Sequence, residues 1–352
     1  MREMEIGRGG RVLRVRDVGE PDGTVVMYFH GTPGSRLDLC FGEQLAAERG
    51  VRLISFDRPG YGGSTPAPFG IASIAADAHA VADELGVARF ATLGMSGGGP
   101  AALAASAVPG GRVIRAGIAS GAGPFQLVPG ALDELDDNDR AAVSLLPGDP
   151  AAAASAFAAG FEPLAALARE AGGGGVVSAF EDLLSPRDSE LLRVQRYASA
   201  FAETMHEALR QGTSGAGWDN VSWIGRWDID LNAIHCPVLL WYGSDDRLAP
   251  PVHGSWLSAN LPSARLILRD GEGHFGIYEH LGEMLDALTE PDTADPASTV
   301  RPLAPGRRFR HPLFGKVGRR SAMRPTRDRQ ITLRAKYTRS HRRQLPPMTA
   351  AV

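Results

Sequence analysis

Short apolar segments alternate with helix-like segments over the first third of the chain, and this alternation restricts the fold more than any other feature. Apolar runs at 51–56, 89–93 and 113–119 are bounded by turn residues, as buried parallel strands usually are. A helix-like segment lies between them at 74–85, and Ser73 is a suitable cap for its start. Parallel strands need crossover segments, which helices supply. The sequence therefore predicts an α/β fold, a mostly parallel sheet with helices on both faces.

Further segments extend the same scheme in both directions. Runs rich in Val, Ile and aromatic residues predict more strands, and apolar residues at helical spacing predict the helices between them. Strands are expected at 11–17, 24–29, 238–242 and 264–268, and helices at 37–49, 97–108 and 279–288.

A long stretch, 124–228, interrupts the alternation. It lacks strong strand signals and is rich in Ala, Leu and Glu, and its segments 151–171 and 188–210 predict helices. We interpret it as a helical cap inserted into a core domain that residues 1–123 and 229–290 form together.

The composition changes again in residues 291–352. This segment holds 15 Lys or Arg and 3 Asp or Glu, or +12, whereas residues 1–290 carry −15 and the whole chain only −3. Apolar periodicity disappears as Arg, Pro and Ser become frequent, so we predict a basic disordered tail. Binding to nucleic acid is one hypothesis for it, but the segment contains no recognised nucleic-acid-binding module. A functionally silent extension is favoured, and no nucleic-acid partner is expected.

The overall composition indicates a folded protein in a reducing compartment. Hydrophobic residues make up 43% of the chain, which is enough for a substantial core. Cys40 and Cys236 are expected as two buried thiols rather than a disulfide. The N-terminus has no apolar run typical of a secretory signal, and no window approaches the roughly 18 consecutive apolar residues of a membrane span. We therefore expect a cytoplasmic protein without a membrane partner. The oligomeric state stays open.

The most informative motif is the turn Gly94-Met95-Ser96-Gly97-Gly98, which lies between a predicted strand and a predicted helix. A serine on such a turn is held in a strained conformation that projects its hydroxyl above the sheet edge. Gly94 and Gly98 allow the turn to close, and the following helix points its N-terminus toward a developing anion. The motif predicts that Ser96 is a nucleophile, with the amide of Gly97 as one donor to the oxyanion.

With four other motifs in the same order, the chain resembles the α/β-hydrolase superfamily over about residues 5–290. The helical cap is the least specific part of this resemblance. The motifs are His30-Gly31-Thr32-Pro33-Gly34, Asp57-Arg58-Pro59-Gly60-Tyr61-Gly62-Gly63-Ser64, Gly243-Ser244-Asp245-Asp246 with Pro250, and Gly271-Glu272-Gly273-His274.

The resemblance implies a catalytic triad of Ser96, Asp246 and His274, because the family orders these groups as serine, acid and histidine. Asp245 is the alternative acid, but the family spacing from Gly243 to the later proline selects Asp246. His280, in the predicted last helix, is expected to be structural.

The His-Gly-x-Pro resemblance also implies that the amide of Thr32 is the second oxyanion donor, while His30 itself does no chemistry. Asp57 and Arg58 are expected to fix their loop rather than to contact substrate. The cap tryptophans Trp218, Trp223 and Trp227 either line a substrate pocket or simply pack the cap on the core, and the sequence does not separate the two.

The function predicted from these residues is hydrolysis of a small ester, thioester, lactone or amide through an acyl-enzyme, with a small-molecule substrate and without a metal or organic cofactor. Epoxide hydrolases and haloalkane dehalogenases share the His-Gly-x-Pro loop but have aspartate at the position of Ser96. A proline iminopeptidase-like enzyme and a carbon–carbon bond hydrolase stay open as alternatives. A non-enzymatic alternative is a small-molecule binding protein that retains the fold.

Truncation after residue 290 should leave the melting temperature and the catalytic constants nearly unchanged. The tail has no apolar pattern to offset the roughly 1–2 kcal/mol per residue that ordering would cost. Thermal melting and ester turnover of both forms in one buffer test this, and ion exchange should show the shorter form to be strongly acidic. A drop of more than about 5 °C would instead mean that the tail stabilises the folded domain.

Overall fold

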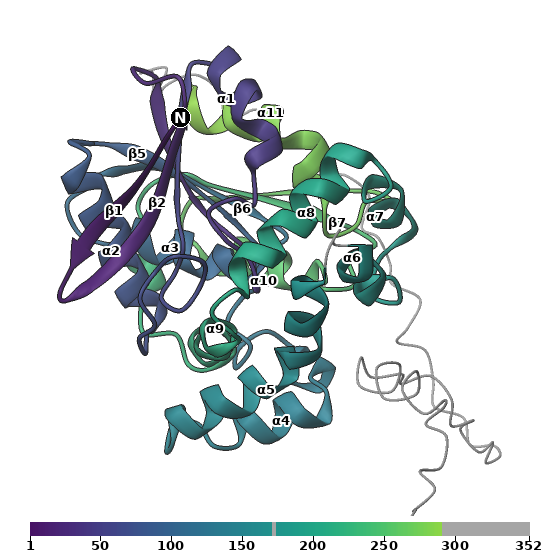
Figure 1. Cartoon of the computed structure of the whole chain (residues 1–352). Coiled ribbons are helices and arrows are strands. Elements are labelled where there is room, and N and C mark those ends of the chain that lie inside the picture. The colour runs from purple at the N-terminus through teal and green to yellow at the C-terminus, as the bar shows by residue number, and fades with distance from the viewer. Residues whose placement is uncertain (171–173, 291–352) are drawn as a thin grey trace, which may run out of the picture. The chain divides into compact units, whose positions relative to one another are not determined.

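An eight-stranded sheet forms the centre of the computed structural model, which describes residues 1–170 and 174–290 (Figure 1). The sheet order is β1-β2-β4-β3-β5-β6-β7-β8. The strands are β1 (Arg2–Arg8), β2 (Arg11–Gly19), β3 (Thr24–Phe29), β4 (Val51–Phe56), β5 (Phe90–Met95), β6 (Val113–Ala119), β7 (Val238–Gly243) and β8 (Ala264–Arg269).

The strands from β4 to β8 in this order all run parallel, whereas β1 and β2 form an antiparallel hairpin at one edge. The sequence pattern does not predict β1, because its residues are mostly charged. Those charges suit an edge strand, where they discourage pairing with another chain. Here they also pair across the hairpin, since Glu3 lies 2.7 Å from Arg16 and 3.4 Å from Arg14.

Helices cover both faces of the sheet, as predicted. Alternate residues of β3 face opposite sides: Val26 and Tyr28 pack in one apolar cluster, and Val25, Met27 and Phe29 pack in the other. This period of two is what a strand buried on both faces requires. The first cluster includes residues of α1 (Glu43–Glu48) and α11 (Gly276–Thr289), and the second includes residues of α2 (Ile71–Glu84), α3 (Gly99–Ala107) and α10 (Val252–Asn260).

Most predicted elements are confirmed, but three predicted helices, at 37–49, 74–85 and 188–210, differ from the structure. The strands at 24–29, 51–56 and 113–119 have the predicted bounds. The helix expected at 37–49 is wrong in its first part, because only Glu43–Glu48 is α-helical, after a short 3-10 turn. Upstream, side-chain bonds hold the chain in a loop, such as the 2.5 Å bond that Tyr28 donates to Asp38.

The helix expected at 74–85 begins three residues earlier, at Ile71. Ser73 therefore lies in its first turn rather than at the cap position. Its hydroxyl still accepts a hydrogen bond from the Gly70 amide at 3.2 Å, as in a capping box. The serine correctly indicates a helix start, but its predicted position at the cap is wrong.

Between β6 and β7 the described chain forms helices and no strand. We call this segment the cap, and its division from the core as an inserted domain stays a prediction. Figure 1 shows these helices gathered beside the sheet. The helices are α4 (Asp137–Val143), α5 (Pro150–Arg169), α6 (Gly174–Phe180), α7 (Pro186–Leu191), α8 (Gln195–Ala208) and α9 (Ser214–Ile224). The segment 188–210, expected to form one helix, instead contains part of α7 and all of α8.

By length and composition, α5 is the one described helix that could cross a membrane. It carries one buried stripe, which includes Ala153, Phe157 and Leu164, and it packs against α4 and α9. A helix packed inside a protein can pass the same test, so α5 alone is weak support for a membrane span.

Two other sequence expectations have different outcomes. Cys40 and Cys236 are unpaired, as predicted, although both are half-buried rather than fully buried. The basic tail predicted at 291–352 lies outside the described residues, and the cytoplasmic location stays a prediction.

Candidate active site

Ser96 occupies a strained turn at the end of β5. Its φ angle is +53°, in the left-handed region that residues other than glycine rarely adopt. The turn closes only because its neighbours are small: a β-carbon on Gly94 would collide with the backbone of Gly98, and one on Gly98 would collide with the carbonyl of Phe29. The surrounding structure therefore holds Ser96 in the conformation that the motif predicted.

His274 and Asp246 form a buried hydrogen-bonded pair. The His274 Nδ1 atom lies 2.9 Å from Asp246 Oδ2 and 3.1 Å from Oδ1, and each residue is only 4% exposed. Asp246 Oδ1 also accepts hydrogen bonds from the amides of Leu248 and Ala249 at 2.9 and 2.8 Å. These bonds fix the carboxylate and present it to one nitrogen of the ring.

Burial and charge act in opposite directions on this pair. Burial alone would lower the pKa of His274, but the charge and hydrogen bond of Asp246 outweigh it, and the net pKa lies above the ordinary 6.5. Burial likewise favours a higher pKa for Asp246, yet His274 and the two amides bring the pKa below its ordinary 3.8. The geometry therefore stabilises a carboxylate beside an imidazolium.

Asp245, His280 and His30 have different surroundings from Asp246 and His274. Asp245 is exposed and accepts a hydrogen bond from Ser244 at 3.1 Å, so Asp246 is the aspartate that contacts His274. His280 instead bonds Glu272 at 2.8 Å. His30 is fully buried, and burial followed by the charge of Arg58 lowers its pKa well below 6.5.

Ser96, Asp246 and His274 follow β5, β7 and β8, and the carboxyl ends of these parallel strands share one edge of the sheet. The loop after β6 bridges the gap between them. Its Ala122 amide bonds the Ser96 carbonyl at 3.3 Å, and its Gly121 carbonyl accepts a 2.5 Å bond from the Tyr242 hydroxyl on β7. The three residues predicted from the sequence are thus placed on one connected edge.

On the other side of Ser96, the two predicted oxyanion residues lie next to each other. A β-carbon on Gly97 would collide with the side chain of Thr32, and one on Gly31 would lie 3.6 Å from the Ser96 β-carbon, so the loop packs against the serine turn. The Thr32 hydroxyl donates a 2.8 Å hydrogen bond to Asp219 of α9. The side chain of Thr32 therefore attaches its loop to the cap and leaves the backbone of the loop beside the serine turn.

Arg58 holds the same loop from beneath. It is 1% exposed and forms an ion pair with Asp219, with Nε 2.8 Å and Nη2 2.5 Å from the carboxylate oxygens. It also donates to the carbonyls of His30 and Gly31 at 2.6 and 2.9 Å. The sequence prediction that Arg58 fixes a loop agrees with these contacts. Tyr61 completes the cluster with a 2.6 Å bond to Asp219.

Asp57 also fixes loops through hydrogen bonds. Its carboxylate accepts bonds from the amide and the guanidinium of Arg36, both at 2.7 Å, and from the amide of Gly63 at 2.9 Å. These bonds join loops at the carboxyl edge of the sheet, so Asp57 is also a loop-fixing residue.

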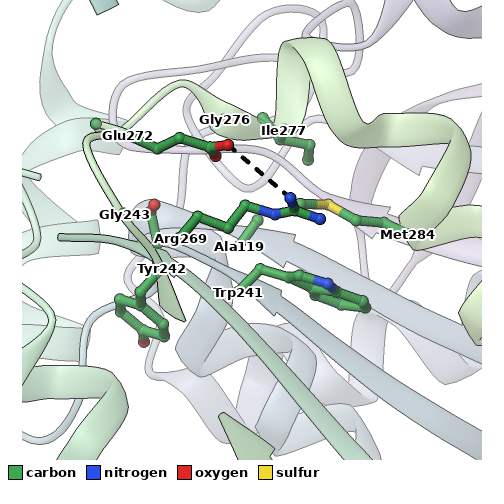
Figure 2. Close-up of a pocket in the computed structure, with 11 residues that line it drawn as sticks. Ala119, Trp241, Tyr242, Gly243, Arg269, Glu272, Gly276, Ile277 and Met284 are labelled. Atoms are coloured by element: carbon green, nitrogen blue, oxygen red, sulfur yellow. Dashed lines mark ion pairs between the residues drawn. The ribbon is translucent and has the colours of Figure 1, made fainter. Parts of the chain in front are cut away.

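A small pocket lies beneath the loop that carries His274, between β7, β8 and α11 (Figure 2). Trp241, Arg269 and Glu272 line it, and Figure 2 shows the Arg269–Glu272 ion pair across it. None of the residues that line it is Ser96, Asp246 or His274. Within residues 1–170 and 174–290, no group of three or more His, Cys, Asp or Glu residues could hold a metal ion.

A family model described as alpha/beta hydrolase fold matches residues 24–281. The chain belongs to the α/β-hydrolase fold family. No curated protein matched this hydrolase-fold chain.

Several solved structures share its fold. They include an enol-lactonase from Burkholderia xenovorans LB400 (18% identity, TM-score 0.57, 81% of this chain and 98% of that chain covered). A thermophilic esterase from Thermogutta terrifontis has 20% identity and a TM-score of 0.57, with 82% of this chain and 97% of that chain covered. The esterase RhEst1 from Rhodococcus sp. ECU1013 has 22% identity and a TM-score of 0.54, with 82% and 98% covered.

Asp188 is a site residue that the sequence analysis missed. This carboxylate of cap helix α7 is buried, and it accepts hydrogen bonds from the backbone amides of His274 at 3.0 Å and Phe275 at 2.8 Å. It also accepts one from the Ser185 hydroxyl at 2.8 Å. The Ser185-Pro186-Arg187-Asp188 pattern is a capping box, so its local signal indicated a helix start and gave no sign of the histidine loop 86 residues away.

Replacing Asp188 with Asn should destabilise the protein and lower the pKa of His274. Whichever way the new amide is oriented, its NH2 group faces an amide N–H, so we expect a loss of about 1–3 kcal/mol in unfolding free energy. The negative charge of Asp188 is one of the influences that raise the pKa of His274, so its removal should lower that pKa. Denaturant titration and NMR of the histidine ring are the measurements.

Glu190→Gln is the matched control, because Glu190 lies on the same helix but is exposed and its carboxylate bonds Arg187 rather than the histidine loop. It should change neither quantity. Equal effects of the two substitutions would show that Asp188 does not position the histidine loop.

Proposed function

We propose that this protein is a serine hydrolase that cleaves a small ester, thioester, lactone or amide through an acyl-enzyme. The observation that carries the proposal is the buried His274–Asp246 pair on the same sheet edge as the strained Ser96 turn. A serine hydroxyl is a weak nucleophile until a neutral base removes its proton, and that base needs an orienting carboxylate. These residues match both requirements.

In the proposed reaction, the Ser96 oxygen attacks the carbonyl carbon of the substrate while His274 takes the hydroxyl proton. The carbonyl electron pair moves onto oxygen and gives a tetrahedral intermediate. As it collapses, the bond to the leaving group breaks, and His274 returns the proton to the leaving oxygen, sulfur or nitrogen. Water then attacks the acyl carbon while His274 takes a proton from the water. As the second tetrahedral intermediate collapses, the bond to the Ser96 oxygen breaks, His274 returns the proton to that oxygen, and the acid is released.

Asp246 orients His274 and stabilises its charged form during these steps. Because Nδ1 of His274 faces Asp246, we assign the proton transfers to Nε2. The amides of Gly97 and Thr32 are proposed to donate to the oxyanion. The Arg58–Asp219 pair supports this donor set indirectly, because it fixes the backbone of residues 30–32 from both sides.

The fold-level likeness to esterases and an enol-lactonase is consistent with oxygen esters or lactones as substrates. It does not single out an acyl group. The bonds that the proposed chemistry can cleave are those in which a carbonyl carbon bears a leaving oxygen, sulfur or nitrogen.

Ser96→Ala should abolish labelling by a fluorophosphonate probe and lower ester turnover by on the order of 10⁴-fold. The probe forms its bond to an activated serine oxygen, which the variant lacks. Gel fluorescence and a panel of p-nitrophenyl esters of increasing chain length are the measurements. Ser255→Ala, at an exposed serine of α10, should label and react like the wild type. Undiminished labelling of Ser96→Ala would remove the proposal.

The acidic limb of the kcat/KM profile should lie above pH 6.5. Only neutral His274 can accept a proton, and its raised pKa keeps it protonated to a higher pH than an ordinary histidine. In Asp246→Asn the opposing charge is gone while the burial stays, so the limb should move to lower pH and the rate should fall by roughly 10⁴-fold. Asp245→Asn should leave the acidic limb at the wild-type pH and the rate within about twofold of the wild-type rate. A larger loss from Asp245→Asn would reassign the acid.

A further inference from the structure

The indole N–H of Trp223 is a buried donor without an acceptor. Its Nε1 atom is shielded from solvent and has no hydrogen-bond partner among the residues that the structure describes. Buried polar groups in native proteins are nearly always paired, since an unpaired donor destabilises the fold. A donor that is retained unpaired near a reactive group therefore raises the question of which acceptor reaches it.

The position of this donor answers the question. A β-carbon placed on Gly97 would lie 3.1 Å from Trp223 Nε1, on the same side of Gly97 as the side chain of Thr32. Gly97 directly follows Ser96, and its amide is one of the two proposed oxyanion donors. The indole nitrogen thus lies close to Gly97, whose amide is expected to face the developing negative charge.

Several contacts hold Trp223 and its helix. The Trp223 carbonyl accepts a 2.9 Å bond from Trp227 Nε1, and the Trp223 ring packs against Phe125 with the centroids 5.3 Å apart. Its helix, α9, is fixed to the core through the Asp219–Arg58 ion pair. A preorganised donor in a water-shielded site is the kind that contributes most to transition-state stabilisation.

We propose that the Trp223 indole N–H is a third hydrogen-bond donor to the substrate carbonyl oxygen as that oxygen becomes negatively charged. The proposal rests on the serine hydrolase function proposed above, and it assigns to the cap a part in the chemistry. The acceptor is the oxygen of a tetrahedral acyl centre bonded to Ser96. In the resting protein this acceptor is not yet formed, which accounts for the missing partner.

The test compares Trp223→Phe with Trp241→Phe. Both substitutions remove a buried indole N–H that has no partner in the described part of the chain, and both keep an aromatic ring. Trp241 lies on β7 at the small pocket of Figure 2, outside the site proposed for the reaction. Any general effect of losing an indole should therefore appear in both variants.

Trp223→Phe should lower kcat on p-nitrophenyl esters by roughly tenfold to a hundredfold with little change in KM, as expected for a bond to a charged oxygen. It should weaken inhibition by an alkyl trifluoromethyl ketone by a similar factor. That ketone accepts the Ser96 oxygen at its carbonyl carbon and becomes a tetrahedral oxyanion, while the serine proton passes to His274. Trp241→Phe should leave kcat, KM and the inhibition constant unchanged.

NMR of protein labelled with ¹⁵N at tryptophan gives a readout without turnover. The signal that is missing from Trp223→Phe identifies the Trp223 indole among the five tryptophans. Formation of the ketone adduct should move that signal downfield and leave the Trp241 signal in place. An unchanged inhibition constant in Trp223→Phe, or a change in KM alone, would overturn the donor proposal while wild-type labelling keeps the serine hydrolase proposal. Failure of the wild type to label with fluorophosphonate would overturn both.

Discussion

The parallel direction of six neighbouring strands is the constraint from which the site follows. Parallel strands end at one edge of a sheet, so residues that follow β5, β7 and β8 are brought together although up to 178 positions separate them in the sequence. The same direction leaves the first helix after β5 with its N-terminus at that edge. The strained serine turn is then possible because Gly94 and Gly98 give the backbone room to reverse there.

Buried charged residues also order the loops at this edge of the sheet. Two cap aspartates supply the order. Asp188 bonds the backbone of the histidine loop, and Asp219 joins Arg58, Tyr61 and Thr32 around the loop on the opposite side of the serine. Burial of Arg58 would favour loss of its charge, but Asp219 more than compensates and raises its pKa above the ordinary value. Each loop is thereby held in part by a carboxylate from the segment between β6 and β7.

Features of the fold and of the site that depend on neighbouring residues could be predicted from the sequence, whereas those that depend on contacts between distant segments could not. The strands at 24–29, 51–56 and 113–119 are determined by local apolar runs, and the Ser96 turn by a local pattern of glycines, so both could be predicted. In the sequence, only the family spacing distinguishes Asp246 from its neighbour Asp245 as the acid. The structure gives the physical difference, because Asp245 is exposed and Asp246 is hydrogen-bonded to His274.

Contacts between distant segments leave no comparable signal. Asp219 resembles any polar residue of a helix until Arg58 is placed 2.5 Å from it. Asp188 matches the third helical position of a capping box and occupies it, but it also accepts a hydrogen bond from the histidine loop. The helix predicted at 37–49 is wrong in part for the same reason, because side-chain bonds from other segments hold its first residues in a loop. The apolar residues of that segment have helical spacing, but spacing does not report on bonds to residues elsewhere in the chain.

The buried Arg58–Asp219 pair has a consequence for how such proteins can diversify. The core arginine is 1% exposed, and its counter-charge belongs to the cap. A transplanted cap without a carboxylate at that point would leave a cation buried and uncompensated, at a cost of several kcal/mol. Chimeras joined at the cap boundaries should therefore be most stable when both partners carry matching charges at this position.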